Sequence, residues 1–155
     1  FENQQLRVGF RLWKRIFLKK FLSKNVAVID ATSAFSQKEN NIFLDSRMKK
    51  EYDVSHIENS IFIGFSELID DLPASIKKDD SIIVYCSVGV RSDIMARKLI
   101  KAGYTNVKNL YGGIFEWLNN EFEVVDKDGQ PTKNIHAFNT KFGVWLNKGT
   151  KIYNK

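Results

Sequence analysis

Short strand-like runs alternate with helical segments through the middle of this chain, and this alternation most restricts the fold. The predicted strands are apolar and rich in β-branched residues, and they cover residues 26–29, 42–45, 60–64, 81–85 and 107–110. The predicted helices or turns that follow them cover residues 32–38, 48–54, 66–72, 92–102 and 113–120. Alternation of this kind is typical of a mostly parallel sheet with helices on both faces. In such folds, ligands bind at the carboxyl ends of the strands.

Length and composition predict a single domain over residues 1–155. A chain of 155 residues with 43% hydrophobic residues can bury a core without disulfides or a structural metal. The net charge is +6, but basic and acidic residues are mixed along the middle of the chain, so we expect no nucleic-acid partner. No apolar run approaches the length of a membrane span, and no signal-peptide pattern is visible. A cytoplasmic location is favoured, while a start at Phe1 rather than Met leaves export to a bacterial envelope open.

Residues 5–22 are predicted to form a basic amphipathic helix. Its apolar stripe consists of Leu6, Phe10, Trp13, Phe17 and Phe21. Its basic side consists of Arg7, Arg11, Lys14, Arg15 and Lys19. We favour a helix packed on the domain with a solvated basic face, and we keep contact with a membrane surface or a partner as the alternative.

Residues 123–155 form a segment of different character. A turn signal at residues 126–131 precedes aromatic residues interleaved with Lys and Asn, namely Phe138, Phe142, Trp145 and Tyr153. We predict an extension whose aromatic side chains pack on the domain, with the amino-terminal helix as a candidate surface. The alternative is an aromatic and basic surface for a nucleic acid or a partner.

The single cysteine, Cys86, follows the predicted central strand over residues 81–85 and precedes a short loop that opens into a helix. At this position a thiol faces the positive end of the helix dipole, and the loop amides can point inwards to hold an anion. Arg91 adds a fixed positive charge. These features favour the reactive thiolate, and they distinguish Cys86 from a small buried hydrophobic residue.

Three segments of this chain resemble the rhodanese family of sulfurtransferases. They are the loop Tyr85-Cys86-Ser87-Val88-Gly89-Val90-Arg91-Ser92, the stretch Leu44-Asp45-Ser46-Arg47 with Glu51-Tyr52 and His56-Ile57, and the stretch Asn109-Leu110-Tyr111-Gly112-Gly113 with Trp117. The resemblance covers about residues 25–122. It implies a rhodanese-like three-layer α/β fold with a five-stranded, mostly parallel sheet. The amino-terminal helix and the extension lie outside it.

The resemblance also implies a reaction in which Cys86 carries a sulfane sulfur as a persulfide. The donor would be thiosulfate or another persulfide, and the acceptor would be a thiol, cyanide or a protein. Arg91 would orient the donor. The loop amides that would stabilise the anionic sulfur belong to Ser87, Val88, Gly89, Val90 and Ser92. No cofactor or metal ion is expected.

Two alternatives share this fold. A regulatory or sulfur-relay module with weak or no catalysis remains open, because Arg91 is the only cation in the loop and a thiosulfate dianion is better served by two. A cysteine phosphatase is less favoured, because its loop has one more residue between the cysteine and the arginine to hold a phosphate. Here four residues, 87–90, separate Cys86 from Arg91.

Asp45 and Arg47 lie at the end of the predicted strand 42–45. Side chains at this edge of the sheet are near the expected pocket. We expect Asp45 and Arg47 to make polar contacts that support the loops around the strand ends rather than to take part in the reaction.

Overall fold

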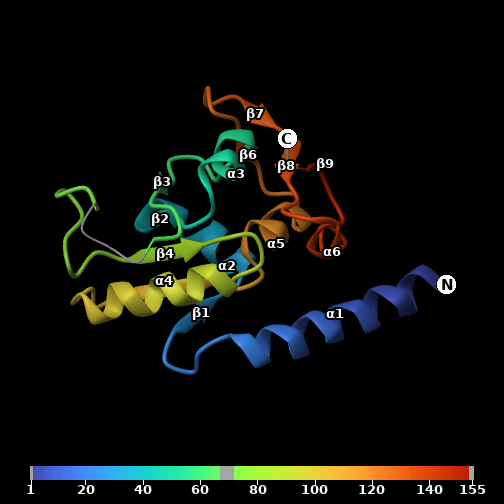
Figure 1. Cartoon of the computed structure of the whole chain (residues 1–155), viewed down its shortest axis with the longest axis horizontal. Coiled ribbons are helices and arrows are strands. Elements are labelled where there is room, and N and C mark those ends of the chain that lie inside the picture. The colour runs from blue at the N-terminus through green and yellow to red at the C-terminus, as the bar shows by residue number, and fades with distance from the viewer. Residues whose placement is uncertain (1, 67–71, 154–155) are drawn as a thin grey trace.

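The computed structural model of the chain describes residues 2–66 and 72–153. Its centre is a five-stranded parallel sheet with the strand order β1-β5-β4-β2-β3 (Figure 1). The strands are β1 (Ala27–Ile29), β2 (Ile42–Asp45), β3 (Ile61–Phe62), β4 (Ile82–Tyr85) and β5 (Val107–Leu110). All five lie within a residue or two of the predicted positions, which confirms the α/β fold.

The helices of the domain are α1 (Glu2–Phe21), α2 (Ala31–Ser36), α3 (Lys49–Val54), α4 (Val90–Lys101) and α5 (Gly113–Asn119), with a 3-10 turn at Lys38–Asn40. Helix α4 begins two residues before the predicted start. The reason is Gly89, which caps the helix with a φ of 110°, a left-handed conformation that glycine adopts without strain. The helix predicted over residues 66–72 falls almost entirely outside the described residues.

The core has two halves, one on each face of the sheet. Ile83 and Tyr85 of β4 pack on the side of α1, α2 and α5. Ile82 and Val84 of the same strand pack on the other side, against α4. Because successive side chains of a strand point to opposite faces, a central strand covered on both sides is apolar at every position. All four residues of β4 are buried, and this strand positions Cys86.

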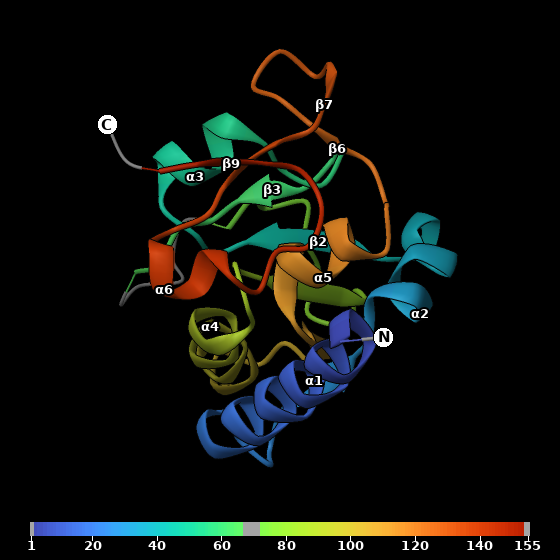
Figure 2. The same cartoon turned by 90° about the vertical axis from the view of Figure 1, so that its right-hand side faces the viewer.

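The carboxy-terminal extension, residues 123–153, wraps over the α5 side of the domain (Figure 2). It contains β6 (Val124–Val125) paired with β7 (Pro131–Thr132), β8 (Asn134–His136) paired with β9 (Thr150–Ile152), and the short helix α6 (Thr140–Gly143). Its aromatic rings meet α1: the Trp145 ring centre is 5.7 Å from that of Trp13 and 5.2 Å from that of Phe17.

Helix α1 packs on the domain with a side that only partly matches its apolar stripe: Phe17 of the stripe packs against the core. Lys14, predicted on the solvated basic face, is buried together with Leu18, whereas Trp13 and Phe21 of the apolar stripe are half exposed. Lys14 can be buried because its ammonium group donates to the Trp145 carbonyl (2.9 Å) and to a carboxylate oxygen of Glu116 (3.3 Å). In the described part of the chain, no helix is long and apolar enough to cross a membrane.

Candidate active site

Cys86 lies directly after β4, the middle strand of the sheet, and its side chain is buried. The Gly89 N–H donates a hydrogen bond to the sulfur (N···S 3.1 Å). The Ser92 hydroxyl oxygen, from the first turn of α4, lies 3.4 Å from the same sulfur. The loop therefore curls around Sγ and directs donors at it, as an anionic or strongly polarised sulfur requires.

Asn109 of β5 holds this loop in place through two hydrogen bonds. Its amide nitrogen donates to the Gly89 carbonyl (2.9 Å), and its amide oxygen lies 2.7 Å from the Ser92 hydroxyl. A hydroxyl has one hydrogen, so Ser92 donates either to Asn109 or to Cys86 at any moment. Asn109 thus fixes the backbone of the loop and also competes for the hydrogen atom that faces the sulfur.

The start of α5 packs against the loop without space for a side chain. The Ile114 N–H donates to the Cys86 carbonyl (2.9 Å), and the Phe115 N–H donates to the Ser87 carbonyl (3.2 Å). A Cβ atom on Gly113 would lie 2.4 Å from the Ser87 carbonyl oxygen and 2.5 Å from that of Cys86. Gly113 also has a φ of 62°, so both its backbone conformation and this close approach require glycine.

Arg91 does not point freely into the loop, because it forms a two-pronged ion pair with Glu51 of α3. The nitrogen–oxygen distances are 2.8 and 2.9 Å, and the Ser87 hydroxyl bridges the two groups. Burial alone would raise the pKa of Glu51, but its hydrogen bonds and charge interaction with Arg91 lower that pKa to about 2. The carboxylate is therefore ionised at neutral pH. Its negative charge compensates the positive charge of Arg91, the residue that was predicted to orient a donor.

The carboxy-terminal extension also reaches this site. The ring of Phe138 covers the guanidinium of Arg91, with 4.8 Å from Cζ to the ring centre. Phe138 has a φ of 67°, which is strained for a residue other than glycine, and its N–H donates to Nδ1 of His136 (3.0 Å). Strained backbone of this kind persists only where the surrounding contacts hold it.

Asp45 and Arg47 form a fully buried ion pair next to the loop. Two guanidinium nitrogens of Arg47 contact the Asp45 carboxylate, the shortest distance being 2.7 Å, and one of them also donates to the Ser55 carbonyl (2.7 Å). Burial by itself would lower the pKa of Arg47, but the charge and hydrogen bonds of Asp45 outweigh this effect and raise that pKa. These contacts tie the end of β2 to the end of α3, which carries Glu51.

Glu51, Asn109 and Phe138 were not among the predicted site residues. Glu51 and Asn109 lie inside the family-like segments, which was a usable signal, but nothing in the sequence around Phe138 relates it to Arg91. The structure does not bring the predicted loop amides equally close: within the described loop, the N–H that contacts the sulfur is that of Gly89. Among residues 2–66 and 72–153, no group of three or more His, Cys, Asp or Glu is placed to hold a metal ion.

The geometry defines a class of protein: a parallel α/β domain that presents one thiol in a tight loop at the end of its central strand. Comparison with known families agrees, because the sequence model of the rhodanese-like domain matches residues 18–120. The chain belongs to the rhodanese-like domain family. Both the fold and the family predicted from the sequence are therefore confirmed.

Similar proteins carry this domain as one part of a longer chain. An "adenylyltransferase and sulfurtransferase" of Candida albicans is 33% identical over 57% of this chain and 22% of its own length. A tRNA uridine(34) hydroxylase of Pectobacterium carotovorum is 28% identical over 57% of this chain and 26% of its own length. The chain thus spans about a quarter of the length of these relatives.

Solved structures show the same fold. A rhodanese-related protein of Thermoplasma volcanium superposes with a TM-score of 0.58 at 29% identity, covering 64% of this chain and 97% of the other. A thiosulfate sulfurtransferase of Pseudomonas aeruginosa superposes with a TM-score of 0.60 over 86% of this chain and 25% of the other. Its 18% identity supports the fold alone. The chain is thus a rhodanese-like domain with sulfurtransferases among its relatives.

Proposed function

We propose that this protein is a sulfurtransferase that carries a sulfane sulfur as a persulfide on Cys86. The observation that carries the proposal is the sulfur of Cys86 in a loop of four intervening residues, with the Gly89 N–H directed at it (3.1 Å). A loop that directs an N–H group at the sulfur suits a small anionic sulfur species.

The transfer has two steps, the loading of sulfur onto Cys86 and its transfer to an acceptor. The Cys86 thiolate attacks the outer sulfur of the donor, a new S–S bond forms, and the donor's own bond to that sulfur breaks. The bonding electron pair leaves with the donor remnant, which is sulfite from thiosulfate or a thiolate from a persulfide. An acceptor nucleophile, a thiolate or cyanide, then attacks the outer sulfur of the persulfide and releases Cys86 as a thiolate.

The pairing of Arg91 with Glu51 favours a donor of low charge. A carboxylate at 2.8 Å cancels much of the attraction that Arg91 would exert on a dianion. Phe138 covers one face of the guanidinium as well. We therefore expect a small-molecule persulfide to load Cys86 more efficiently than thiosulfate does.

A sulfur relay to a protein acceptor is the second candidate. The pairing of Arg91 with Glu51 supports this relay as well. A site that binds thiosulfate weakly suits a domain that receives sulfur from a persulfide and passes it to a protein. The relatives that contain this domain are about four times as long as their matching part, which agrees with such a relay.

Mass spectrometry of the intact protein tests the proposal. The protein is incubated separately with thiosulfate, mercaptopyruvate and glutathione persulfide, and peptide mapping locates any added sulfur. We expect a gain of one sulfur atom on Cys86 with at least one donor, and no gain in Cys86→Ser, which should unfold at nearly the same temperature. A folded protein that gains no sulfur from any donor, or that releases phosphate from an aryl phosphate through Cys86, would contradict the assignment.

A further inference from the structure

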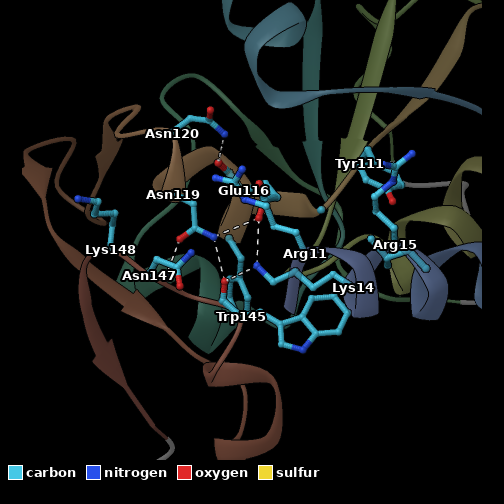
Figure 3. A pocket seen from close by; sticks show the side chains of 13 residues that line it. Arg11, Lys14, Arg15, Tyr111, Glu116, Asn119, Asn120, Trp145, Asn147 and Lys148 are labelled. Carbon is cyan, nitrogen blue, oxygen red and sulfur yellow. Dashed lines mark hydrogen bonds and ion pairs between the residues drawn. The ribbon is translucent and has the colours of Figure 1, made fainter. Parts of the chain in front are cut away.

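A cavity whose lining does not include Cys86 lies between α1, α5 and the carboxy-terminal extension. It is a cavity of about 790 Å³, within the size range of small-molecule sites, which is roughly 300–1,000 Å³ (Figure 3). Its lining includes four basic side chains, Arg11, Lys14, Arg15 and Lys148, and one carboxylate, Glu116. The cavity is therefore strongly positive, and the reaction proposed for Cys86 does not use it.

The floor of the cavity is a hydrogen-bonded network built by three separate segments. Lys14 of α1 donates to the Trp145 carbonyl and to the Glu116 carboxylate. Asn119 of α5 donates to the same two acceptors, at 2.9 and 3.1 Å. One oxygen of the Glu116 carboxylate, Oε1, thus accepts from both Lys14 and Asn119, and the Lys14 side chain is about nine-tenths buried.

Two arginines of α1 line the cavity beside this network. Arg11 and Arg15 are exposed, are one helical turn apart on α1, and form no ion pair with any described residue. Figure 3 shows both side chains extending from α1 along the cavity, with Lys14 beside them. Like charges at positions i and i+4 repel each other and destabilise a helix. A bound anion removes that repulsion.

The opposite rim carries further polar groups. Asn120, Asn147 and Lys148 are exposed there; the Asn120 amide donates to the Glu116 carbonyl (2.7 Å), and Lys148 pairs with Glu121 (3.5 Å). Tyr111 lies near Arg15 at one end of the cavity (Figure 3). Guanidinium groups bind phosphate and carboxylate oxygens in pairs, and neutral amides complete the shell around such groups. A ligand with a single charge would leave one arginine unsatisfied.

We propose that this cavity binds a small soluble molecule with at least two anionic groups, phosphates or carboxylates, held by Arg11 and Arg15. The proposal rests on the cavity alone and is independent of sulfur transfer.

Isothermal titration of the full chain with inorganic pyrophosphate and with citrate tests it. We expect saturable binding of at least one probe, and about a tenfold or greater loss of affinity in the Arg11→Gln/Arg15→Gln variant, since this variant loses the charge-assisted hydrogen bonds to the anion. The control is Lys19→Gln/Lys20→Gln, which removes the same charge from the same helix outside the cavity and should retain the affinity. The probe should also raise the unfolding temperature of the parent and the control, and not that of the arginine variant.

Three results would overturn the proposal. The first is no saturable binding of either probe at millimolar concentration by protein whose circular dichroism shows it folded. The second is an equal loss of affinity in both double variants, which would indicate general charge screening. The third is binding to vesicles containing phosphatidic acid without binding of the soluble probes, which would assign the arginines to membrane contact beside the exposed Leu12, Trp13 and Ile16.

Discussion

At the scale of single residues, the site is a sulfur atom held by neighbours that come from four elements. Gly89 precedes α4 and donates to Sγ, Asn109 of β5 braces the loop, and Gly113 of α5 lies against its carbonyls. Glu51 of α3 fixes Arg91. These four residues position the loop around Cys86, the residue that we propose to carry the sulfur.

The two arginines near the strand ends should respond differently to substitution. We expect Arg91→Ala to reduce sulfur transfer per folded molecule more than Arg47→Ala does, because Arg91 belongs to the loop around Cys86. Arg47→Ala should instead lower the stability by about 3–5 kcal/mol, since it leaves Asp45 as an unpaired buried charge. Steady-state kinetics, corrected for the folded fraction from circular dichroism, separate the two effects. A larger loss of activity per folded molecule in Arg47→Ala would refute these roles.

At the scale of elements, the close contact between α5 and the Cys86 loop is the feature that shapes the site. The loop can curl tightly only because the first residue of α5 has no side chain. Gly113 and Gly129 both have left-handed φ values, 62° and 78°, but a Cβ on Gly129 would meet nothing within 4 Å. Alanine substitutions at these two glycines therefore distinguish the destabilisation due to the backbone conformation from that due to the close contact between Gly113 and the Cys86 loop.

Gly129→Ala should cost only the conformational strain, about 1–2 kcal/mol, and should leave sulfur loading unchanged. Gly113→Ala carries the same strain and in addition pushes the loop carbonyls away by its Cβ. We expect a larger loss of stability and a clear loss of sulfur loading in Gly113→Ala. Urea unfolding and mass spectrometry of the persulfide measure the two quantities. Equal stability and equal loading in the two variants would show that the contact is unimportant.

At the scale of the whole molecule, elements distant in sequence are joined by charges. The Arg91–Glu51 pair connects α4 to α3 across 40 positions of the chain, and the Lys14–Glu116 pair connects α1 to α5 across 102. Because the Glu51 carboxylate is fully buried beside Arg91, its protonation affects the stability of the entire fold.

Glu51 makes the stability depend on pH in a defined window. Its pKa is about 2 in the folded protein and 4.5 as its ordinary value, so its contribution is complete above pH 4.5 and is lost as the pH falls towards 2. We expect the free energy of unfolding to fall over this window in the parent and less steeply in Glu51→Gln. Urea titrations at several pH values measure it, with the exposed Glu39→Gln as the control. If Glu51→Gln and Glu39→Gln gave the same slope as the parent, the ion pair would not be linked to folding.

Local sequence patterns were enough to predict the sheet, the place of Cys86 and the family. These depend on local patterns: an apolar run indicates a buried strand such as residues 81–85, and a short glycine-containing loop before a helix indicates an anion cradle. The same patterns located the amino-terminal helix and part of its packed side, but not the burial of Lys14. Lys14 is buried there by partners that lie more than a hundred positions away in the sequence.

Which charged side chains pair with one another could be learned only from the folded arrangement of the elements. Periodicity tells which face of an element is apolar, but it does not tell which carboxylate will lie opposite a given arginine, because that depends on contacts between distant segments. Glu51 therefore emerged as the partner of Arg91, and Phe138 as its cover, only once α3 and the extension were placed. The basic cavity likewise exists only where α1, α5 and the extension come together.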